Sequence, residues 1–343
     1  MKPMPSLTAW RILAWTTCEP VYGLPSHEDQ TVMRICSLVP GATEVVAALD
    51  LTGQLVAVSH ECDYPESVRH IPSVVESVID QYTLSSDAID RAVKQLVSAG
   101  QRLYRLNEQR LIEARPDVIL TQDLCHVCAV TPDQLTQAMT ALPDAPRLVT
   151  LNPTSLEDML RDIERIAQAV GAADRGQRLL RSLRGRLDQV SARTHPTRPR
   201  VVCLEWLDPL YIAGHWVPEM VALAGGEDVL GRHDQPSRQT TWKEVTDANP
   251  DILLIMPCGY SVQRTVDDLG LLENSTTPWS AQLPRWPETY VLDANAYFSR
   301  PGPRLVDGVE LLSTILHPRP SHHLNPAQAV RLSASMLSVE SRS

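Results

Sequence analysis

Two stretches with the same plan decide the fold of this chain: EARPDVILTQDLC at residues 113–125 and TDANPDILLIMPC at residues 246–258. In each stretch a Pro-Asp pair precedes a short run of aliphatic residues, and a cysteine follows the run. A short apolar run bounded by turn residues is typical of a buried strand. A second matching pair, RICSL at residues 34–38 and RVVCL at residues 200–204, occurs in the same order. The repetition predicts two related halves.

Around these stretches, strands alternate with helices, which is typical of parallel α/β architecture. Further strands are predicted at residues 55–59 and 147–151, and a helical periodicity of apolar residues covers residues 84–113. A longer helical pattern at residues 155–193 separates the halves and is suited to a strut of about 45 Å. The predicted fold class is therefore α/β, with two Rossmann-like lobes joined by a long connecting α-helix.

These patterns divide the chain into five parts. We expect an N-terminal extension at residues 1–32, a first lobe at 33–153, the connecting helix at 154–195, a second lobe at 196–318 and a C-terminal tail at 319–343.

Composition excludes two classes of partner. The 343 residues carry a net charge of −10, whereas binding to nucleic acid or to an anionic membrane surface requires a basic surface. No stretch approaches the roughly 20 apolar residues that a bilayer span needs. We expect a monomer with neither a nucleic-acid partner nor membrane insertion.

The N-terminus and the cysteines favour a cytoplasmic location over a periplasmic or extracellular one. Arg11 interrupts the apolar run of residues 1–23, and no small-residue cleavage site follows it. Seven cysteines in a chain of this length do not resemble a secreted disulfide framework.

The ligand site is predicted where the strands end. Ligands of open α/β sheets lie beyond the carboxyl ends of the strands, and in a two-lobed protein those ends can face a shared cleft. The segments expected there are residues 40–44, 59–65, 121–130, 205–216, 257–261 and 293–304.

Five segments in register resemble a known family. They are SLVPGATE (37–44), SHECDYP (59–65), WLDPLYIAGHWVPEMVALAGGEDVL (206–230), TWKEVTDANPDILLI (241–255) and AYFSRPGPRLVDGVELL (296–312). Their order is similar to that in the cobalamin-binding protein of the bacterial cobalamin importer and its iron-complex-binding relatives, the class III substrate-binding proteins. The resemblance covers residues 34–317. It implies two α/β lobes, limited hinge motion and a large flat ligand in the cleft.

The resemblance also implies a membrane partner. Proteins of this family dock on an ABC permease through one surface glutamate in each lobe, and Glu244 matches the second of these. The first-lobe region near Ala129 has no acidic match. Two further departures are Glu61, which stands where the importer protein has an aromatic residue, and the absence of a tryptophan from SVVESVID (73–80).

Aromatic side chains dominate the expected cleft loops. Such side chains bury a large area against the face of a corrinoid or porphyrin, although tryptophans often serve only as core anchors. Arg300 is expected to bind a carboxamide oxygen or phosphate of the ligand, unless it fixes its loop through a salt bridge. The ligand-binding set predicted from both lobes is Glu61, Tyr64, Trp206, Trp216, Trp242, Tyr297, Phe298 and Arg300.

The cysteines offer a different chemistry. Cys125 and Cys128 form a C-x-x-C pair around His126, and Cys62 follows His60 on the neighbouring predicted cleft loop. Three thiolates and a histidine are a ligand set for zinc or iron. The alternatives are a thiol–disulfide pair, a thiolate facing a ligand-bound metal, or small packed loop residues.

The leading hypothesis is therefore a non-enzymatic protein that binds cobalamin or a similar corrinoid, either as an importer's substrate-binding protein or as an intracellular carrier. One alternative is an iron-siderophore or haem-binding protein on the same fold. Another is a metal- or thiol-dependent enzyme centred on Cys62, Cys125 and Cys128.

Overall fold

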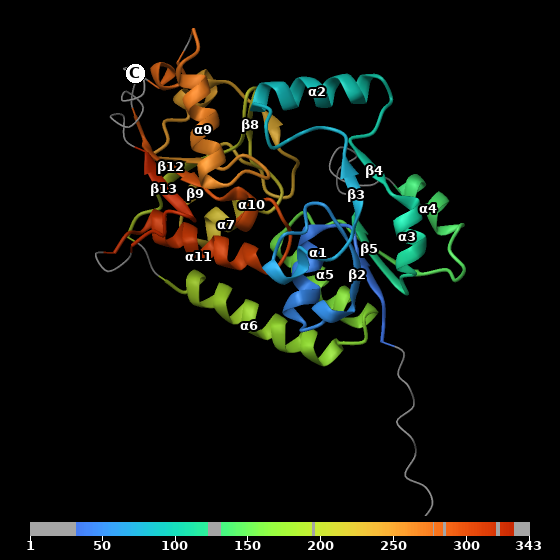
Figure 1. The fold of residues 1–343 in the computed structure, drawn as a ribbon. Helices are drawn as coiled ribbons and strands as arrows, with labels where there is room; N and C mark the ends of the chain where they lie inside the picture. The colour runs from blue at the N-terminus through green and yellow to red at the C-terminus, as the bar shows by residue number, and fades with distance from the viewer. Residues whose placement is uncertain are drawn as a thin grey trace, which may run out of the picture. The chain divides into compact units, whose positions relative to one another are not determined.

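The strands of the chain form two separate sheets, each covered by helices (Figure 1). The computed structural model describes residues 32–122, 132–193, 196–276, 278–283, 286–319 and 323–332. Both sheets belong to one compact unit, residues 33–343.

The first sheet has six strands in the order β4-β3-β2-β1-β5-β6. Their bounds are β1 Ile35–Ser37, β2 Leu55–Ser59, β3 Ser73–Ser77, β4 Tyr104–Leu106, β5 Val118–Gln122 and β6 Arg147–Leu151. All pair in parallel except β4, which is antiparallel to β3 at the edge. The helices of this part are α1 Pro40–Ala48, α2 Ser86–Ser98, α3 Glu108–Ala114 and α4 Pro132–Met139.

The second sheet follows the order β10-β8-β7-β11-β12-β13, with β9 paired to β7. Its strands are β7 Arg200–Leu207, β8 Leu210–Ile212, β9 Glu227–Asp228, β10 Arg238–Gln239, β11 Ile252–Ile255, β12 Glu288–Leu292 and β13 Ala329–Leu332. The helices are α7 Val217–Leu223, α8 Trp242–Asp247, α9 Val262–Glu273, α10 Ala294–Tyr297 and α11 Arg304–Leu316. Residues 329–332, expected in a C-terminal tail, instead add the edge strand β13 antiparallel to β12.

The repeated Pro-Asp motif makes the same contacts in both lobes. In the first lobe, the Asp117 N–H donates to the Arg34 carbonyl at 2.8 Å, and the Arg34 N–H donates to the Asp117 carboxylate at 2.7 Å. In the second lobe, Asp251 and Arg200 exchange the corresponding bonds at 2.8 and 2.9 Å. The motif therefore fixes the entry of a central strand, β5 or β11, beside its parallel neighbour.

The segment between the lobes consists of two helices where one was expected. α5 spans Leu156–Ala169 and α6 spans Ala173–Ser191. The chain turns at Gly171, whose φ of 70° is in the left-handed region that glycine adopts without steric cost. α6 is the long connecting helix, and it packs on α5, α7 and α11 (Figure 1). The predicted fold class, two α/β lobes with a long connecting helix, is confirmed.

One apolar core is shared by the two lobes. It contains buried side chains of α1, α5, α6, α7 and α11, among them Val45, Met159, Leu183, Met220 and Val309. Two smaller clusters cover the opposite face of each sheet. Because the shared core is continuous, the lobes are joined by packing as well as by the chain.

The helical periodicity over residues 84–113 proves to be two helices and a strand. α2 ends before Gly100, β4 follows, and Asn107 caps α3 by accepting from the Arg110 N–H at 3.0 Å. No helix within the described ranges is both long and apolar enough to cross a membrane.

Candidate functional site

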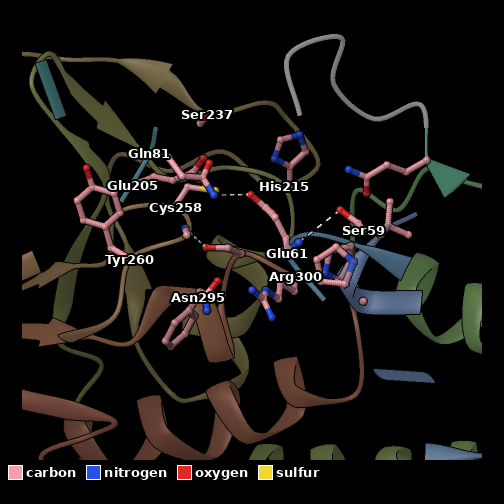
Figure 2. Close-up of a pocket in the computed structure, with 18 of the residues that line it drawn as sticks. Ser59, Glu61, Gln81, Glu205, His215, Ser237, Cys258, Tyr260, Asn295 and Arg300 are labelled. Atoms are coloured by element: carbon pink, nitrogen blue, oxygen red, sulfur yellow. Dashed lines mark hydrogen bonds between the residues drawn. The ribbon is translucent and has the colours of Figure 1, made fainter. Parts of the chain in front are cut away.

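A cavity of about 740 Å³ lies between the two sheets, beyond the carboxyl ends of their parallel strands (Figure 2). Its size is in the range of sites for organic ligands and cofactors. The first lobe contributes loops after β1, β2, β3 and β6, and the second lobe contributes loops after β7, β11 and β12. Most of the predicted cleft segments therefore contribute to one space.

Three of the predicted aromatic residues line this cavity: Trp206, Trp216 and Phe298. The Trp216 indole N–H donates to the Phe298 carbonyl at 2.8 Å, so these two residues form one wall. The ring of Trp206 meets that of Tyr260 edge-on, with ring centroids 5.4 Å apart. Trp216, Tyr260 and Phe298 are at most 5% exposed, so the partly buried ring of Trp206 is the most accessible of these four on this side of the cavity.

The other three predicted aromatic residues are placed elsewhere. Trp242 stacks on Trp279, with ring centroids 5.8 Å apart, in the separate core of the second lobe. Tyr297 packs against the shared core, and its hydroxyl accepts from Gln328 at 3.0 Å. The Tyr64 ring is 47% exposed and lies 4.0 Å from the Arg304 guanidinium. Because none of the three lines the cavity, they are left out of the binding set proposed below.

Glu61 lines the cavity from the loop after β2, and its predicted contact with a ligand stays a prediction. Its carboxylate accepts from the Gln81 amide at 2.8 Å (Figure 2). His60 lies beside it, with 3.8 Å between His60 Nε2 and Glu61 Oε1. Burial lowers the pKa of His60, so the imidazole is neutral at pH 7.

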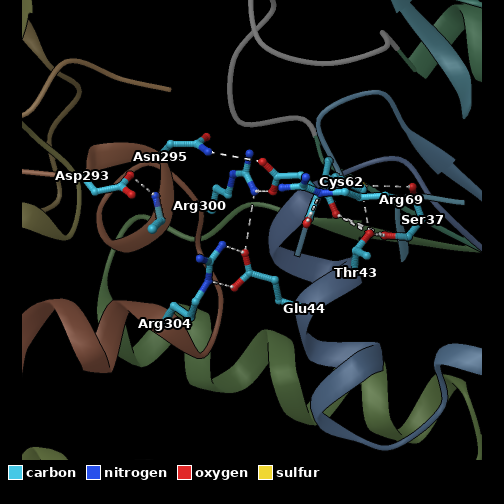
Figure 3. A network of polar contacts seen from close by, with 12 residues as sticks. Ser37, Thr43, Glu44, Cys62, Arg69, Asp293, Asn295, Arg300 and Arg304 are labelled. Carbon is cyan, nitrogen blue, oxygen red and sulfur yellow. Dashed lines mark hydrogen bonds and ion pairs between the residues drawn. The ribbon is translucent and has the colours of Figure 1, made fainter. Parts of the chain in front are cut away.

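A network of charged residues connects the lobes at the base of the cavity (Figure 3). Arg304 of α11 donates to both carboxylate oxygens of Glu44 on α1, with 2.9 Å between Nε and Oε2. Arg300 donates to Asp63 and lies 4.0 Å from Glu44. Asn295 donates to Asp63 at 3.4 Å. We call these five residues the base network.

Burial and charge determine the titration of the base network. Burial raises the pKa of Glu44, which is 4% exposed, and Arg304 and Arg300 only partly offset this effect. Burial would also raise the pKa of Asp63, but the hydrogen bond and charge of Arg300 lower it below its usual value. Backbone contact adds to these bonds, since a Cβ on Gly41 would lie 2.3 Å from the Pro301 carbonyl oxygen. The lobes are therefore tightly fitted at the base.

Arg300 was expected to contact the ligand, and the structure shows it engaged by the protein. Its side chain lines the cavity but is only 7% exposed and donates to Asp63. This geometry agrees with the alternative prediction, in which Arg300 fixes its loop through a salt bridge.

The part of the site that the sequence analysis missed is α2. Ile89, Asp90 and Val93 of this helix line the cavity, as do Gln81 and Tyr82 in the loop before it. The helix follows β3 of the first sheet but lies beside α9 and β8 of the second lobe in Figure 1. Gly100 and Asn107 interrupt the helical pattern, and these two residues could have shown that α2 and α3 are separate helices.

Hydrogen bonds to the backbone hold α2 against the second lobe. The Ser86 N–H donates to the Asp268 carboxylate at 3.3 Å, and Arg264 donates to the carbonyls of Tyr82 and Leu84. An anion at a helix N-terminus interacts favourably with the helix dipole. The Trp206 indole completes the contact by donating to the Ser86 carbonyl at 3.3 Å. We call these bonds the α2 contact.

His215 is a second missed residue of the cavity. It precedes α7 at a φ of 50°, and its backbone N–H donates to the Gln235 carbonyl at 2.6 Å. Burial lowers the pKa of its imidazole. The sequence feature that could have identified it is the histidine of AGHWVPE, which lies between a strand and a helix that begins with a proline in its first turn.

Cys62 is a buried thiol in a packed setting. Thr43 donates to its sulfur at 3.0 Å, and burial raises the pKa of the thiol to about 12. A metal ligand or nucleophile requires the opposite shift. Among the described residues no three His, Cys, Asp or Glu side chains are grouped to hold a metal ion. Cys125 and Cys128 lie outside the described residues, so the three-cysteine hypothesis stays a prediction.

Glu244, the candidate for permease docking, lies in the first turn of α8. Its carboxylate accepts from Arg238 at 2.6 Å and from the Thr240 hydroxyl at 2.7 Å. The hydrogen bond from Arg238 lowers the pKa of Glu244. The side chain remains 41% exposed, so it is still available at the surface.

Comparison with known proteins gives consistent matches. The profile of the family described as "Periplasmic binding protein" matches residues 35–277. The vitamin B12-binding protein of Vibrio parahaemolyticus is 22% identical over 285 residues, which are 82% of this chain and 88% of that protein.

Two solved structures have the same fold. A periplasmic haem-binding protein from Pseudomonas aeruginosa has a TM-score of 0.64 at 18% identity, covering 88% of this chain and 98% of that one. The periplasmic vitamin B12-binding protein of Vibrio cholerae has a TM-score of 0.58 at 20% identity, covering 82% and 96%. The expected class III substrate-binding-protein fold is confirmed.

The matches also correct the expected location. The family and its solved relatives are periplasmic binding proteins, so the expectation of a cytoplasmic location is wrong. The cysteine argument failed because three of the four described cysteines, Cys36, Cys62 and Cys203, are buried free thiols, whereas Cys258 is exposed. Packing inside strands and loops protects such residues, so their number says little about the compartment.

Proposed function

This chain belongs to the periplasmic binding protein family, and from that premise we propose that its interlobe cavity binds a cobalamin-like corrinoid. The observation that carries the proposal is the cavity itself, about 740 Å³ between two lobes with Trp206, Trp216 and Phe298 on one side. Such rings bury a large area against a flat macrocycle with few rotatable bonds to immobilise. The vitamin B12-binding relatives support this choice of ligand.

The role proposed for the protein is reversible binding without catalysis. The family consists of substrate-binding proteins, and Cys62, the described cysteine of the proposed enzymatic centre, is a buried thiol with a raised pKa. The ligand would be held by stacking on the second lobe and by polar groups of the first lobe, Glu61 among them.

Equilibrium dialysis tests this proposal. The full chain at micromolar concentration is dialysed against cyanocobalamin or aquacyanocobinamide, and the bound corrinoid is measured by its visible absorbance. We expect one corrinoid per chain, and a large loss of affinity in Trp206→Ala. Absence of retained corrinoid with the folded wild-type protein would reject the proposal.

Haem is the second candidate ligand, and one observation favours it. His60 and His215 both line the cavity in the neutral state that binds iron. The haem-binding protein of Pseudomonas aeruginosa has the same fold. Titration with haem distinguishes haem from a corrinoid as the ligand, because axial ligation by histidine shifts the Soret band. Replacing both His60 and His215 by alanine would remove that shift.

We further propose that the protein delivers its ligand to an ABC permease through the surface around Glu244. The salt bridge with Arg238 orients the carboxylate, and the exposed part of the side chain is available to a partner. A pull-down with the cognate permease should weaken in Glu244→Ala, whereas corrinoid binding should be unchanged. Equal capture of both proteins would contradict this surface assignment.

A further inference from the structure

The cavity wall is rich in carboxylates. Acidic side chains of both lobes line it: Glu61, Asp63, Asp90, Asp162 and Glu205. Among the described residues, two arginines line the same space, Arg264 and Arg300. Because the histidines of the cavity have lowered pKa values, they add no positive charge at pH 7. The formal charge around the described part of the cavity is therefore negative.

Both arginines are already engaged by the protein. Arg300 donates to Asp63 and is nearly buried. Arg264 donates to the carbonyls of Tyr82 and Leu84, and its guanidinium lies 4.9 Å from the centre of the Tyr260 ring. Withdrawing either guanidinium to bind an anionic ligand would break contacts between the lobes.

The carboxylates are only partly compensated. Asp90 is paired with Lys94 at 2.7 Å and Asp162 Oδ1 with Arg165 at 2.7 Å. Asp162 Oδ2, in contrast, is buried and accepts no hydrogen bond from any described residue. Glu61 accepts from the uncharged amide of Gln81. These oxygens are acceptors placed for donors that a ligand would bring.

Further carboxylates lie near α2, where Arg91 pairs with Asp87 and Lys94 with Asp90. Burial raises the pKa of Asp208, and the negative charges of Asp87, Asp90 and Asp268 raise it further. Carboxylates from α2, α9 and the β7–β8 turn therefore repel one another beside Asp90, a residue of the cavity wall, and Arg91 offsets part of this repulsion.

We propose that the cavity selects a corrinoid without negative charge: a cationic corrin that carries carboxamides and lacks the nucleotide with its phosphate. An anion in a cavity with no available cation loses hydration without compensation, whereas an amide N–H bonded to a carboxylate forms a charge-assisted hydrogen bond. By the same reasoning, haem, which carries two carboxylates, should bind with the lowest affinity of the three. This selection rests on the proposed corrinoid function, and Glu61 and Asp90 are its specificity-determining residues.

Competition between three probes on the wild-type protein tests the selection. Aquacyanocobinamide and cyanocobalamin share the corrin and the cyanide but differ in the nucleotide and phosphate, and haem adds two carboxylates. We expect aquacyanocobinamide to bind at least about tenfold more tightly than cyanocobalamin, and haem more weakly than both. Equal or tighter binding of cyanocobalamin or haem overturns the selection while leaving macrocycle binding intact.

Variants that replace a carboxylate by an uncharged amide test which residues cause the preference for aquacyanocobinamide. Glu61→Gln should reduce the preference for aquacyanocobinamide over cyanocobalamin to within about threefold, and Asp90→Asn should reduce it less, because Lys94 already pairs with Asp90. Glu164→Gln is the matched control, since Glu164 also accepts from a glutamine amide, that of Gln177 at 2.9 Å, but does not line the cavity. An unchanged preference in folded Glu61→Gln would overturn the role of Glu61. Absence of binding by every probe would instead reject the proposed function.

Discussion

The two polar contacts between the lobes differ in chemistry, and the difference predicts which of them would separate first. The base network joins charged side chains, the buried Glu44 with Arg304 and the half-buried Asp63 with Arg300, beside a close backbone approach at Gly41. The α2 contact consists mainly of bonds from side chains to backbone carbonyls and an N–H. Backbone groups find replacement partners in water more readily than buried charges do. We therefore expect the base to stay closed while α2 moves.

The largest effect is expected from Glu44→Ala. It leaves Arg304 and Arg300 near the base without their shared carboxylate, and removal of one partner of a buried pair costs about 3–5 kcal/mol. Urea unfolding measures this loss.

The control is the exposed pair of Glu157 and Arg184, whose oxygens and nitrogens are 2.9 Å apart. Glu157→Ala should cost less than about 1 kcal/mol, because solvent screens this pair. A similar loss of unfolding free energy in both variants would show that the base network stabilises the protein no more than an exposed ion pair does.

The next effect concerns Trp206, which belongs to the cavity and to the α2 contact at once. Trp206→Ala should weaken aquacyanocobinamide binding by about 2 kcal/mol, roughly thirtyfold, as expected for a buried aromatic anchor. Trp206→Phe keeps a smaller apolar ring and loses the N–H to Ser86, so its affinity should fall less than in Trp206→Ala. Calorimetric titration of both variants tests this order, and equal losses would mean that stacking contributes nothing.

Loss of the α2 contact should mainly change rates. Asp268→Asn weakens the charge at the N-terminus of α2, and Arg264→Met removes the bonds to two carbonyls. We expect ligand dissociation to accelerate about tenfold in Arg264→Met, since two lost hydrogen bonds of about 0.7 kcal/mol each correspond to that factor. Stopped-flow displacement measures it.

Asp267→Asn is the matched control for Asp268. The Asp267 side chain accepts from Gln263 on the exposed face of α9 and does not touch α2. If this variant accelerates dissociation as much as Asp268→Asn, then the release of α2 is not the step that frees the ligand.

The smallest effect expected is that of pH. Burial lowers the pKa of His60 and His215, so both remain neutral from pH 8 to 7 and take up protons only below their ordinary value of 6.5. Affinity for a cationic corrinoid should thus be constant between pH 8 and 7 and fall on further acidification, by a few-fold per protonated imidazole. Titrations at constant ionic strength measure the profile. A change between pH 8 and 7 would contradict the lowered pKa values.

Sequence predicted the strands better than the helices. Residues 55–59 and 147–151 are β2 and β6 as expected, because a short apolar run between turn signals leaves few alternatives. The pattern of residues 84–113 continued across Gly100 and Asn107, where the chain turns and starts a new helix. Periodicity reports which face is buried, not whether the backbone is continuous.

The site was predicted at the level of loops but not of side chains. Phe298 belongs to the shared core and also lines the cavity, while its neighbour Tyr297, at the end of the short helix α10, packs against that core without lining the cavity. Tyr64 and Arg300 are engaged by residues more than 230 positions away, Arg304 and Asp63. Such long-range partners are fixed by tertiary packing, which no local pattern records.

Hydrogen exchange of the full chain, with and without saturating aquacyanocobinamide, tests the central claim most directly. A corrinoid held between the lobes should slow exchange at once in residues 59–63, 84–98 and 296–301, which belong to both walls of the cavity and to α2. Protection confined to one lobe, or no protection with corrinoid bound, would contradict a shared interlobe site.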